Sequence, residues 1–174
     1  MNDPRESHTR MATAMAVAAA VLAIVLFSVL FQDAIDDKLN PNQRVEIVDD
    51  GAGGTIRLRR NSAGHYVATG AINGVRVEFL LDTGATDVSI PARVAQRIGL
   101  EGGRPVPVST ANGTVTVFQT RLDSVALGNL AQRDVEANIN PHMDGKAVLL
   151  GMSFLQHLEL RQRGDYLELR PPAG

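Results

Sequence analysis

Residues 79–86 place three large apolar residues ahead of an acid, a hydroxyl and a glycine. The apolar run 79–81 predicts a buried strand, and Asp82, Thr83 and Gly84 predict a tight turn at its end. A carboxylate held at such a turn is partly withdrawn from water, which favours keeping or sharing a proton. Gly84 has no side chain, so another backbone can approach the acid closely. This order of residue types indicates general acid–base chemistry at Asp82.

The stretch Asp82-Thr83-Gly84-Ala85 resembles the Asp-Thr/Ser-Gly signature of aspartic proteases, and residues 55–171 resemble the retropepsin-like branch of that group. More narrowly, the chain resembles the bacterial, membrane-anchored members of the branch. The resemblance implies a mainly all-β fold: a retropepsin-like half-barrel with one or two short helices, preceded by a single transmembrane helix. It also implies the activity of an aspartic-type endopeptidase.

A second element strengthens the resemblance. Residues 147–151 form an apolar run that ends in glycine. They resemble the apolar-apolar-Gly element that passes beneath the Asp-Thr-Gly loop in aspartic proteases. On that resemblance, we expect Leu150 and Gly151 to pack on the loop and support it.

Peptide hydrolysis by this route requires two carboxylates that share one proton. One takes a proton from the attacking water, and the other protonates the carbonyl oxygen. The sequence has one Asp-Thr/Ser-Gly motif and too little chain for a two-lobed single-chain enzyme, so we expect a homodimer in which Asp82 meets Asp82 of a second copy. The resemblance implies that Thr83 hydrogen-bonds across the interface. A shared proton predicts an activity optimum on the acid side of neutral.

Residues 105–120 predict a long hairpin, because alternating apolar and hydroxyl positions flank an Asn-Gly pair. In the retropepsin-like pattern, the hairpin after the first helix is the flap that closes over substrate, and a plain sheet hairpin is the alternative. The resemblance implies a polypeptide substrate in an extended groove. The residues expected to contact it are Ala85, Asp87, Ala111, Asn112 and Gly113.

Two positions depart from the retroviral pattern. In the viral relatives, an acid follows Asp-Thr-Gly-Ala, an arginine follows the second glycine, and the two pair near the dimer interface. Here Thr86 and Met152 occupy those positions. Both partners are absent together, so no buried charge is left unpaired. The dimer contacts of the viral enzymes are therefore left open for this chain.

Short strands bounded by turn residues make up the rest of the domain. Asn73-Gly74 predicts a type I′ hairpin that positions the strand ending at Asp82. Residues 88–100 predict the one clear helix outside the membrane. A short helical turn is expected at 153–157. The predicted strands cover residues 55–60, 65–72, 75–81, 106–110, 114–119, 121–127, 132–139, 147–150, 158–160 and 166–169.

Residues 11–31 contain no charged residue. A helix over this run is roughly 30 Å long, which matches the hydrocarbon core of a bilayer. Arg5 and Arg10 precede the run and acidic residues follow it, so the positive-inside rule places residues 1–10 in the cytoplasm. We therefore predict a membrane anchor at residues 11–31.

The anchor defines the expected organisation of the chain. Residues 32–54 are polar and predict a linker, and residues 55–171 predict the protease domain. The resemblance to bacterial members implies a single-pass protein of the cell inner membrane, with the protease domain in the periplasm. A cleaved signal peptide is the alternative. It is disfavoured because the apolar core is long and no A-x-A site follows Phe31.

Several other functions are not indicated. A net charge of −2 without a basic, aromatic-rich patch argues against nucleic-acid binding. The absence of cysteine excludes disulfides, thiolate chemistry and cysteine-ligated metal. No metal or other cofactor is expected, because the histidines lack ligand spacing: His8, His65, His142 and His157. Asp123 and Asp134 are interpreted as turn or solvated positions.

A function of another class stays open from the sequence. The same fold can serve as a non-catalytic module for peptide binding or assembly, gripping an extended peptide by strand addition. Replacing Asp82 with asparagine distinguishes the enzyme from the binding module. The enzyme would lose cleavage while it keeps its fold, whereas the phenotype of a binding module would be unchanged.

Overall fold

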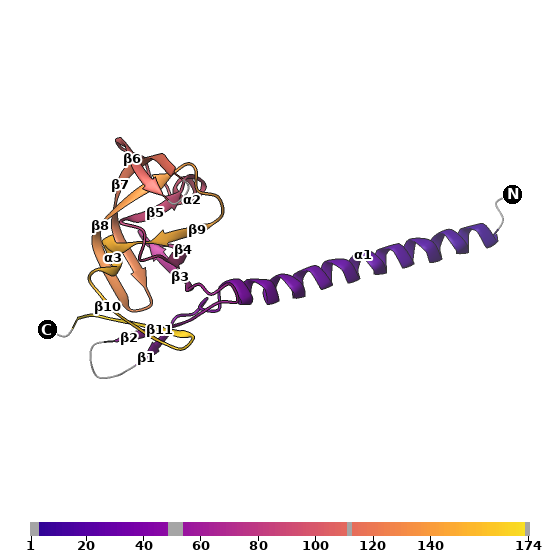
Figure 1. The fold of residues 1–174 in the computed structure, drawn as a ribbon. Coiled ribbons are helices and arrows are strands. Elements are labelled where there is room, and N and C mark those ends of the chain that lie inside the picture. Colours follow the sequence, from indigo (N-terminus) through magenta and orange to yellow (C-terminus); the bar gives the residue numbers. More distant parts are fainter. Residues whose placement is uncertain (1–3, 49–53, 111–112, 173–174) are drawn as a thin grey trace. The chain divides into compact units, whose positions relative to one another are not determined.

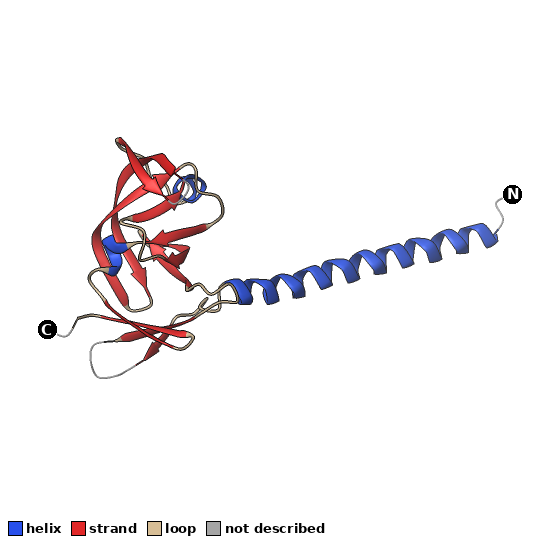
Figure 2. Cartoon of the chain, viewed as in Figure 1, coloured by secondary structure: helices blue, strands red, loops and turns tan. Residues whose placement is uncertain are grey.

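The computed structural model describes residues 4–48, 54–110 and 113–172 (Figure 1). By its internal contacts the chain divides into a helical unit, Met1–Lys38, and a second unit, Leu39–Gly174. Figure 2 shows that strands dominate the second unit, with short helices between them. This agrees with the mainly β domain predicted from the sequence.

The first unit consists of α1 (Pro4–Leu39), a helix of 36 residues. Among the described residues, no helix combines the length and the hydropathy that crossing a membrane requires. The transmembrane helix predicted at residues 11–31 is thus not supported by the structure.

A four-stranded antiparallel sheet joins the two ends of the second unit. Its strands, in spatial order, are β1 (Glu46–Val48), β2 (Thr55–Arg59), β11 (Tyr166–Arg170) and β10 (Glu159–Arg163). One face of β2 and β11 is apolar, and its side chains Ile56, Leu58 and Leu169 are fully buried. The other face carries ion pairs such as Arg57 with Glu168, at 3.0 Å. This sheet holds the end of the chain against the start of the domain.

A seven-stranded sheet carries the predicted site. Its strands are β3 (Val67–Ile72), β4 (Val75–Leu81), β5 (Val88–Pro91), β6 (Pro105–Thr110), β7 (Gly113–Leu127), β8 (Leu130–Asn140) and β9 (Ala147–Leu150). They lie in the order β3-β4-β9-β5-β8-β7-β6, as Figure 1 shows in part, and β3 also pairs with β7. The extra pairing joins Ile72 to Val125, so the sheet curls back on itself. Its interior is part of a single apolar core that includes Phe79, Leu122 and Val148.

The hairpin turns predicted from Asn-Gly pairs are confirmed in outline. Asn73 and Gly74 both have positive φ, 48° and 77°, and connect β3 to β4 as a type I′ turn requires. The second hairpin pairs β6 with β7, and Thr110 lies opposite Gly113. Its turn residues Ala111 and Asn112 lie outside the described residues. Strand β7 then continues through the predicted break near residue 120 as one strand of 15 residues.

The helix predicted at residues 88–100 is wrong over its first turn. Val88–Pro91 is strand β5, and only Ala92–Arg97 is helical, as α2. Strand β5 pairs with β8 and touches β9, and Val88 and Ile90 are fully buried in the core. Pairing on both sides satisfies the backbone of a buried β-branched segment as well as a helix does. The short helix near residue 153 is present as α3 (Met152–Leu155).

Two asparagines that we assigned to the polar linker are buried in the domain instead. Asn40 and Asn42 are 2% and 4% exposed. The Asn42 amide group donates to the carbonyl oxygens of Arg59, at 2.9 Å, and Val67, at 2.7 Å. Its carbonyl oxygen accepts the Arg59 N–H at 2.7 Å. Asn42 therefore ties β2 to β3, which belong to different sheets, and the compact unit starts at Leu39.

We predict that Asn42→Ala lowers the stability of the domain. The change removes three hydrogen bonds and leaves buried backbone groups without partners, at a cost of about 3 kcal/mol. For a domain of this size, the melting temperature should fall by roughly 10 °C, measured by circular dichroism. Asn129→Ala is the matched control, because Asn129 is exposed in the turn after β7. Equal melting temperatures for the two variants would contradict the assigned role.

Candidate active site

Asp82 follows directly on β4, which lies between β3 and β9. The Leu81 N–H donates to the Tyr66 carbonyl at 3.0 Å, and the Asp82 N–H donates to the Leu150 carbonyl at 3.2 Å. Strands β4 and β9 run parallel, with Leu81 opposite Leu150. Both therefore deliver the residues that follow them to the same edge of the sheet. The backbone that carries the acid is thus held from two sides.

The turn itself orients the carboxylate. Gly84 N–H donates to Asp82 Oδ1 at 2.9 Å, and Ala85 N–H donates to the Asp82 carbonyl at 3.2 Å. A Cβ on Gly84 would lie 3.1 Å from that same Oδ1, so a larger residue here would press on the carboxylate. Among the described residues, no hydrogen bond reaches the other oxygen, Oδ2. One side of a half-buried carboxylate is fixed, and the other is available to water or to a second acid.

The segment after β9 supports this turn from beneath. Met152 N–H donates to the Ala85 carbonyl and Ser153 N–H to the Thr86 carbonyl, both at 2.8 Å. A Cβ on Gly151 would collide with the Asp87 carbonyl oxygen and lie 2.7 Å from that of Ala85. Gly151 is therefore required for close backbone approach. The structure thus brings Leu150 and Gly151 against the Asp82 turn, as the resemblance implied.

Ser153 is a supporting residue that the sequence analysis missed. Its Oγ accepts the Val88 N–H at 3.0 Å and donates to the Glu136 carbonyl at 2.8 Å. The hydroxyl therefore connects the end of the Asp82 turn to β8. No local motif marks this residue, because its partners lie 65 and 17 positions away in the chain.

The other predicted site residues are divided between two elements. Thr83 is exposed and Ala85 is half-buried, both in the turn of Asp82. Gly113 is exposed at the start of β7, and no hydrogen bond between described residues joins it to that turn. Thr86 and Met152 are the two departures from the viral pattern. The Thr86 carbonyl accepts from the Ser153 N–H, and the Met152 N–H donates to the Ala85 carbonyl, so both positions join the turn to the segment after β9 through backbone hydrogen bonds. Ala111 and Asn112 cannot be placed, because they lie outside the described residues.

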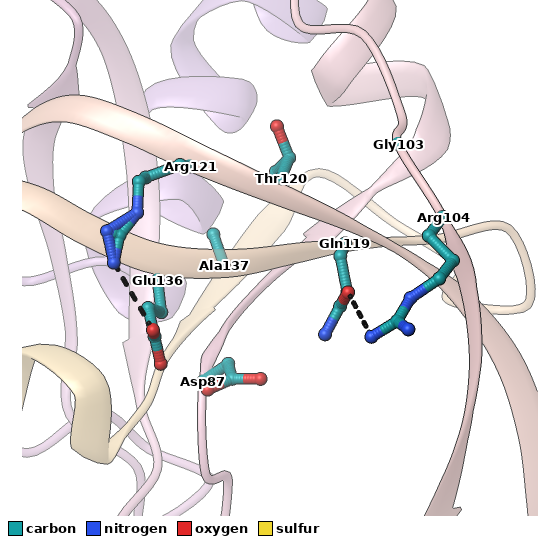
Figure 3. A pocket seen from close by; sticks show the side chains of 8 residues that line it. All are labelled: Asp87, Gly103, Arg104, Gln119, Thr120, Arg121, Glu136 and Ala137. Atoms are coloured by element: carbon teal, nitrogen blue, oxygen red, sulfur yellow. Dashed lines mark hydrogen bonds and ion pairs between the residues drawn. The ribbon is translucent and has the colours of Figure 1, made fainter.

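A pocket of about 390 Å³ opens beside the turn (Figure 3). Asp87 borders it from the end of the turn, and β7 and β8 supply most of the remaining wall. The sequence analysis placed Asp87 near substrate but identified no pocket. The charged wall residues Arg121 and Glu136 are spaced like ordinary solvent-facing strand positions, so only the folded arrangement groups them.

Comparisons with known proteins give a consistent assignment. Residues 68–157 match the family model described as gag-polyprotein putative aspartyl protease. The chain is 32% identical, over 76% of its length, to an uncharacterized protein from the cobV 5′ region of Sinorhizobium sp, and 30% identical, over 61% of its length, to an uncharacterized protein of Rickettsia prowazekii. It spans 58% and 46% of these relatives, respectively.

A solved structure agrees with the family match. The crystal structure of a retropepsin-like aspartic protease from Rickettsia conorii superposes with a TM-score of 0.59 at 26% identity, covering 72% of this chain and 92% of that one. The matched region contains the Asp82 turn, the segment beneath it and the hairpin between them. This chain therefore belongs to the gag-polyprotein putative aspartyl protease family and has the retropepsin-like fold.

Proposed function

We propose that this chain is an aspartic endopeptidase whose active site forms between two copies, each of which contributes Asp82. Family membership and the retropepsin-like fold support the class of reaction. The observation that carries the proposal furthest is the Asp82 carboxylate: one oxygen is held by Gly84, and Oδ2 has no partner among the described residues. A second carboxylate beside Oδ2 would share a proton with it, as the reaction requires.

The roles of the neighbouring residues follow from this arrangement. The Asp82 pair activates a water molecule and protonates the carbonyl oxygen of the peptide. Gly84 fixes the carboxylate, and its missing side chain keeps the approach to the acid open. Exposed Thr83 is available to bond across the two-fold axis. Ala85 and Asp87 line the substrate path, and the β6–β7 hairpin covers it.

The requirement for a second copy follows from counting motifs. The 174 residues hold one Asp-Thr/Ser-Gly sequence, and a lone carboxylate cannot act as base and acid at once in the same step. A symmetric dimer brings the same residue twice to one axis. We therefore propose an obligate homodimer, with interface contacts that differ from those of the viral enzymes at Thr86 and Met152.

For the location of the chain, we propose anchoring through residues 11–31 in the cell inner membrane, with the protease domain in the periplasm. The absence of charge in this run and the arginines before it support the proposal. Apolar side chains on α1 such as Leu22 and Leu26, 69% and 58% exposed, would be buried in lipid. Confinement to one membrane raises the effective concentration of the chains, so a weak dimer would suffice.

We predict that Asp82→Asn reduces peptide cleavage by at least about 100-fold, because loss of a general acid–base group typically has this effect. Cleavage of a mixture of proteome-derived peptides is measured by mass spectrometry, and folding is checked by circular dichroism. Asp123→Asn makes the same chemical change at an exposed position of β7 and should retain activity. Full cleavage by a folded Asp82→Asn protein would refute the assignment of Asp82, and a folded wild type that cleaves no peptide would favour a binding module.

Mixing wild type with Asp82→Asn tests the shared site. With free exchange of subunits and equal amounts of both, roughly half of the wild-type chains sit in inactive mixed dimers, so activity per wild-type chain falls to about half. Adding Asp123→Asn instead should cause no such loss. An enzyme that works as a monomer would show no effect of the Asp82→Asn partner, and that result would exclude the proposed dimer.

For the anchor, we predict that the full chain stays with membranes after alkaline carbonate washing. A chain that begins at Leu39, the start of the compact unit, should be released into the supernatant. Addition of protease to intact spheroplasts should degrade the domain, because it lies outside the cytoplasm. Release of the full chain by carbonate would contradict anchoring, and protection from protease would contradict the orientation.

A further inference from the structure

The pocket beside the Asp82 turn is lined by charged groups from four parts of the chain. Asp87 lies at the end of the turn, Arg121 and Glu136 lie on β7 and β8, and Arg104 precedes β6. Figure 3 shows Asp87 between the Arg121–Glu136 pair on one side and Arg104 with Gln119 on the other. The arrangement brings together positions that are 49 residues apart at most.

Most of these charges already have partners. Arg121 contacts Glu136 at 3.3 Å, and its other terminal nitrogen contacts Asp134 at 3.1 Å. Arg104 donates to the side-chain oxygen of Gln119 at 3.3 Å. Among the described residues, no hydrogen bond or ion pair reaches the Asp87 carboxylate. Asp87 is also half-buried, whereas Arg104, Arg121 and Glu136 are exposed.

This distribution favours a cation in the pocket. The charged groups in and around it are three carboxylates and two guanidinium groups, and Arg121 is neutralised by two of the carboxylates. A partly desolvated carboxylate without a partner gains more from an incoming positive charge than an exposed, hydrated one does. Arg104, being exposed, can turn its guanidinium toward water. Asp87 is therefore the group most able to bind a ligand of opposite charge.

The distance to the acid limits what the ligand can be. Asp87 is five residues after Asp82, and a fully extended chain of that length spans at most roughly 17 Å. An extended peptide rises about 3.3 Å per residue, so the pocket is reached by a side chain within about five residues of the cleaved bond. Ser153 fixes the residue after Asp87 to β8, so the pocket and the Asp82 turn keep one relative position.

We infer that this pocket takes a lysine or arginine side chain of the polypeptide substrate, with Asp87 as the residue that selects it. The inference rests on the proposed function, because it names the substrate class of the same site. Arg121 and Glu136 form the wall along which the apolar stem of the basic side chain lies, and the side-chain oxygen of Gln119, which also accepts from Arg104, accepts a hydrogen bond from its end. Asp87 is a specificity residue and takes no part in bond cleavage.

The test uses the full chain and sets of peptides that differ at a single position. Each set carries lysine or methionine, which are similar in length, at successive positions within five residues of the cleaved bond. At one position, wild type should cleave the lysine peptide with a kcat/KM about 10-fold above that of the methionine peptide. In Asp87→Asn this ratio should fall to about one, and in Asp123→Asn it should stay near the wild-type value.

A binding measurement keeps the inference separate from the proposed function. Fluorescence polarisation of the labelled lysine peptide is measured on Asp82→Asn and on Asp82→Asn with Asp87→Asn. If Asp82→Asn binds the lysine peptide more tightly than the double variant does, the inference is supported. This holds even if the wild type cleaves no peptide, because absence of cleavage would refute only the proposed enzyme. If cleavage depends on Asp82 while the lysine preference is absent or survives in Asp87→Asn, the inference fails and the enzyme stands. If every variant keeps full cleavage and full binding of the lysine peptide, both the proposed enzyme and the inference are overturned.

Discussion

The fold around the candidate site depends on one backbone contact, in which the segment after β9 passes beneath the turn that carries Asp82. Carbonyl groups of Ala85 and Thr86 point toward this segment and need hydrogen-bond donors, which Met152 and Ser153 supply at 2.8 Å. The approach is close enough that even one methyl group on Gly151 would collide with the turn. Because a catalytic carboxylate must be positioned to within about half an ångström, a rigid support of this kind is a condition for chemistry.

The same contact determines what can surround the site. Parallel pairing of β4 with β9 delivers the turn and its support to one edge of the sheet, with Leu81 beside Leu150. Ser153 extends the connection to β8, whose residue Glu136 borders the charged pocket. Asp82 and Asp87 are therefore fixed by one network, which holds the turn and the bordering pocket in one relative position.

The smaller sheet and the buried asparagines give this network a stable base. Asn42 satisfies backbone groups of both β2 and β3, strands that share no ladder. The core is continuous from Ile56 in the smaller sheet to Val148 in the larger one. A short polar segment before the domain is thus structural, since its amide groups replace the hydrogen bonds that a sheet ladder would otherwise supply.

Local signals in the sequence determined the turn chemistry and the strand alternation, and they singled out Asp82 as the candidate acid. The backbone preferences of Asn73-Gly74 alone were enough to predict a hairpin. The order of residues 79–86 was enough to predict that Asp82 lies in a turn at the end of a strand. Tertiary structure decided that residues 88–91 pair as a strand, that Asn40 and Asn42 are buried, and that Ser153 joins the turn to β8. It also decided that Asp87 faces a pocket with Arg121 and Glu136. The difference has a physical cause: turn preferences act within a few residues, whereas burial and hydrogen-bond partners depend on segments that are distant in the chain until it folds.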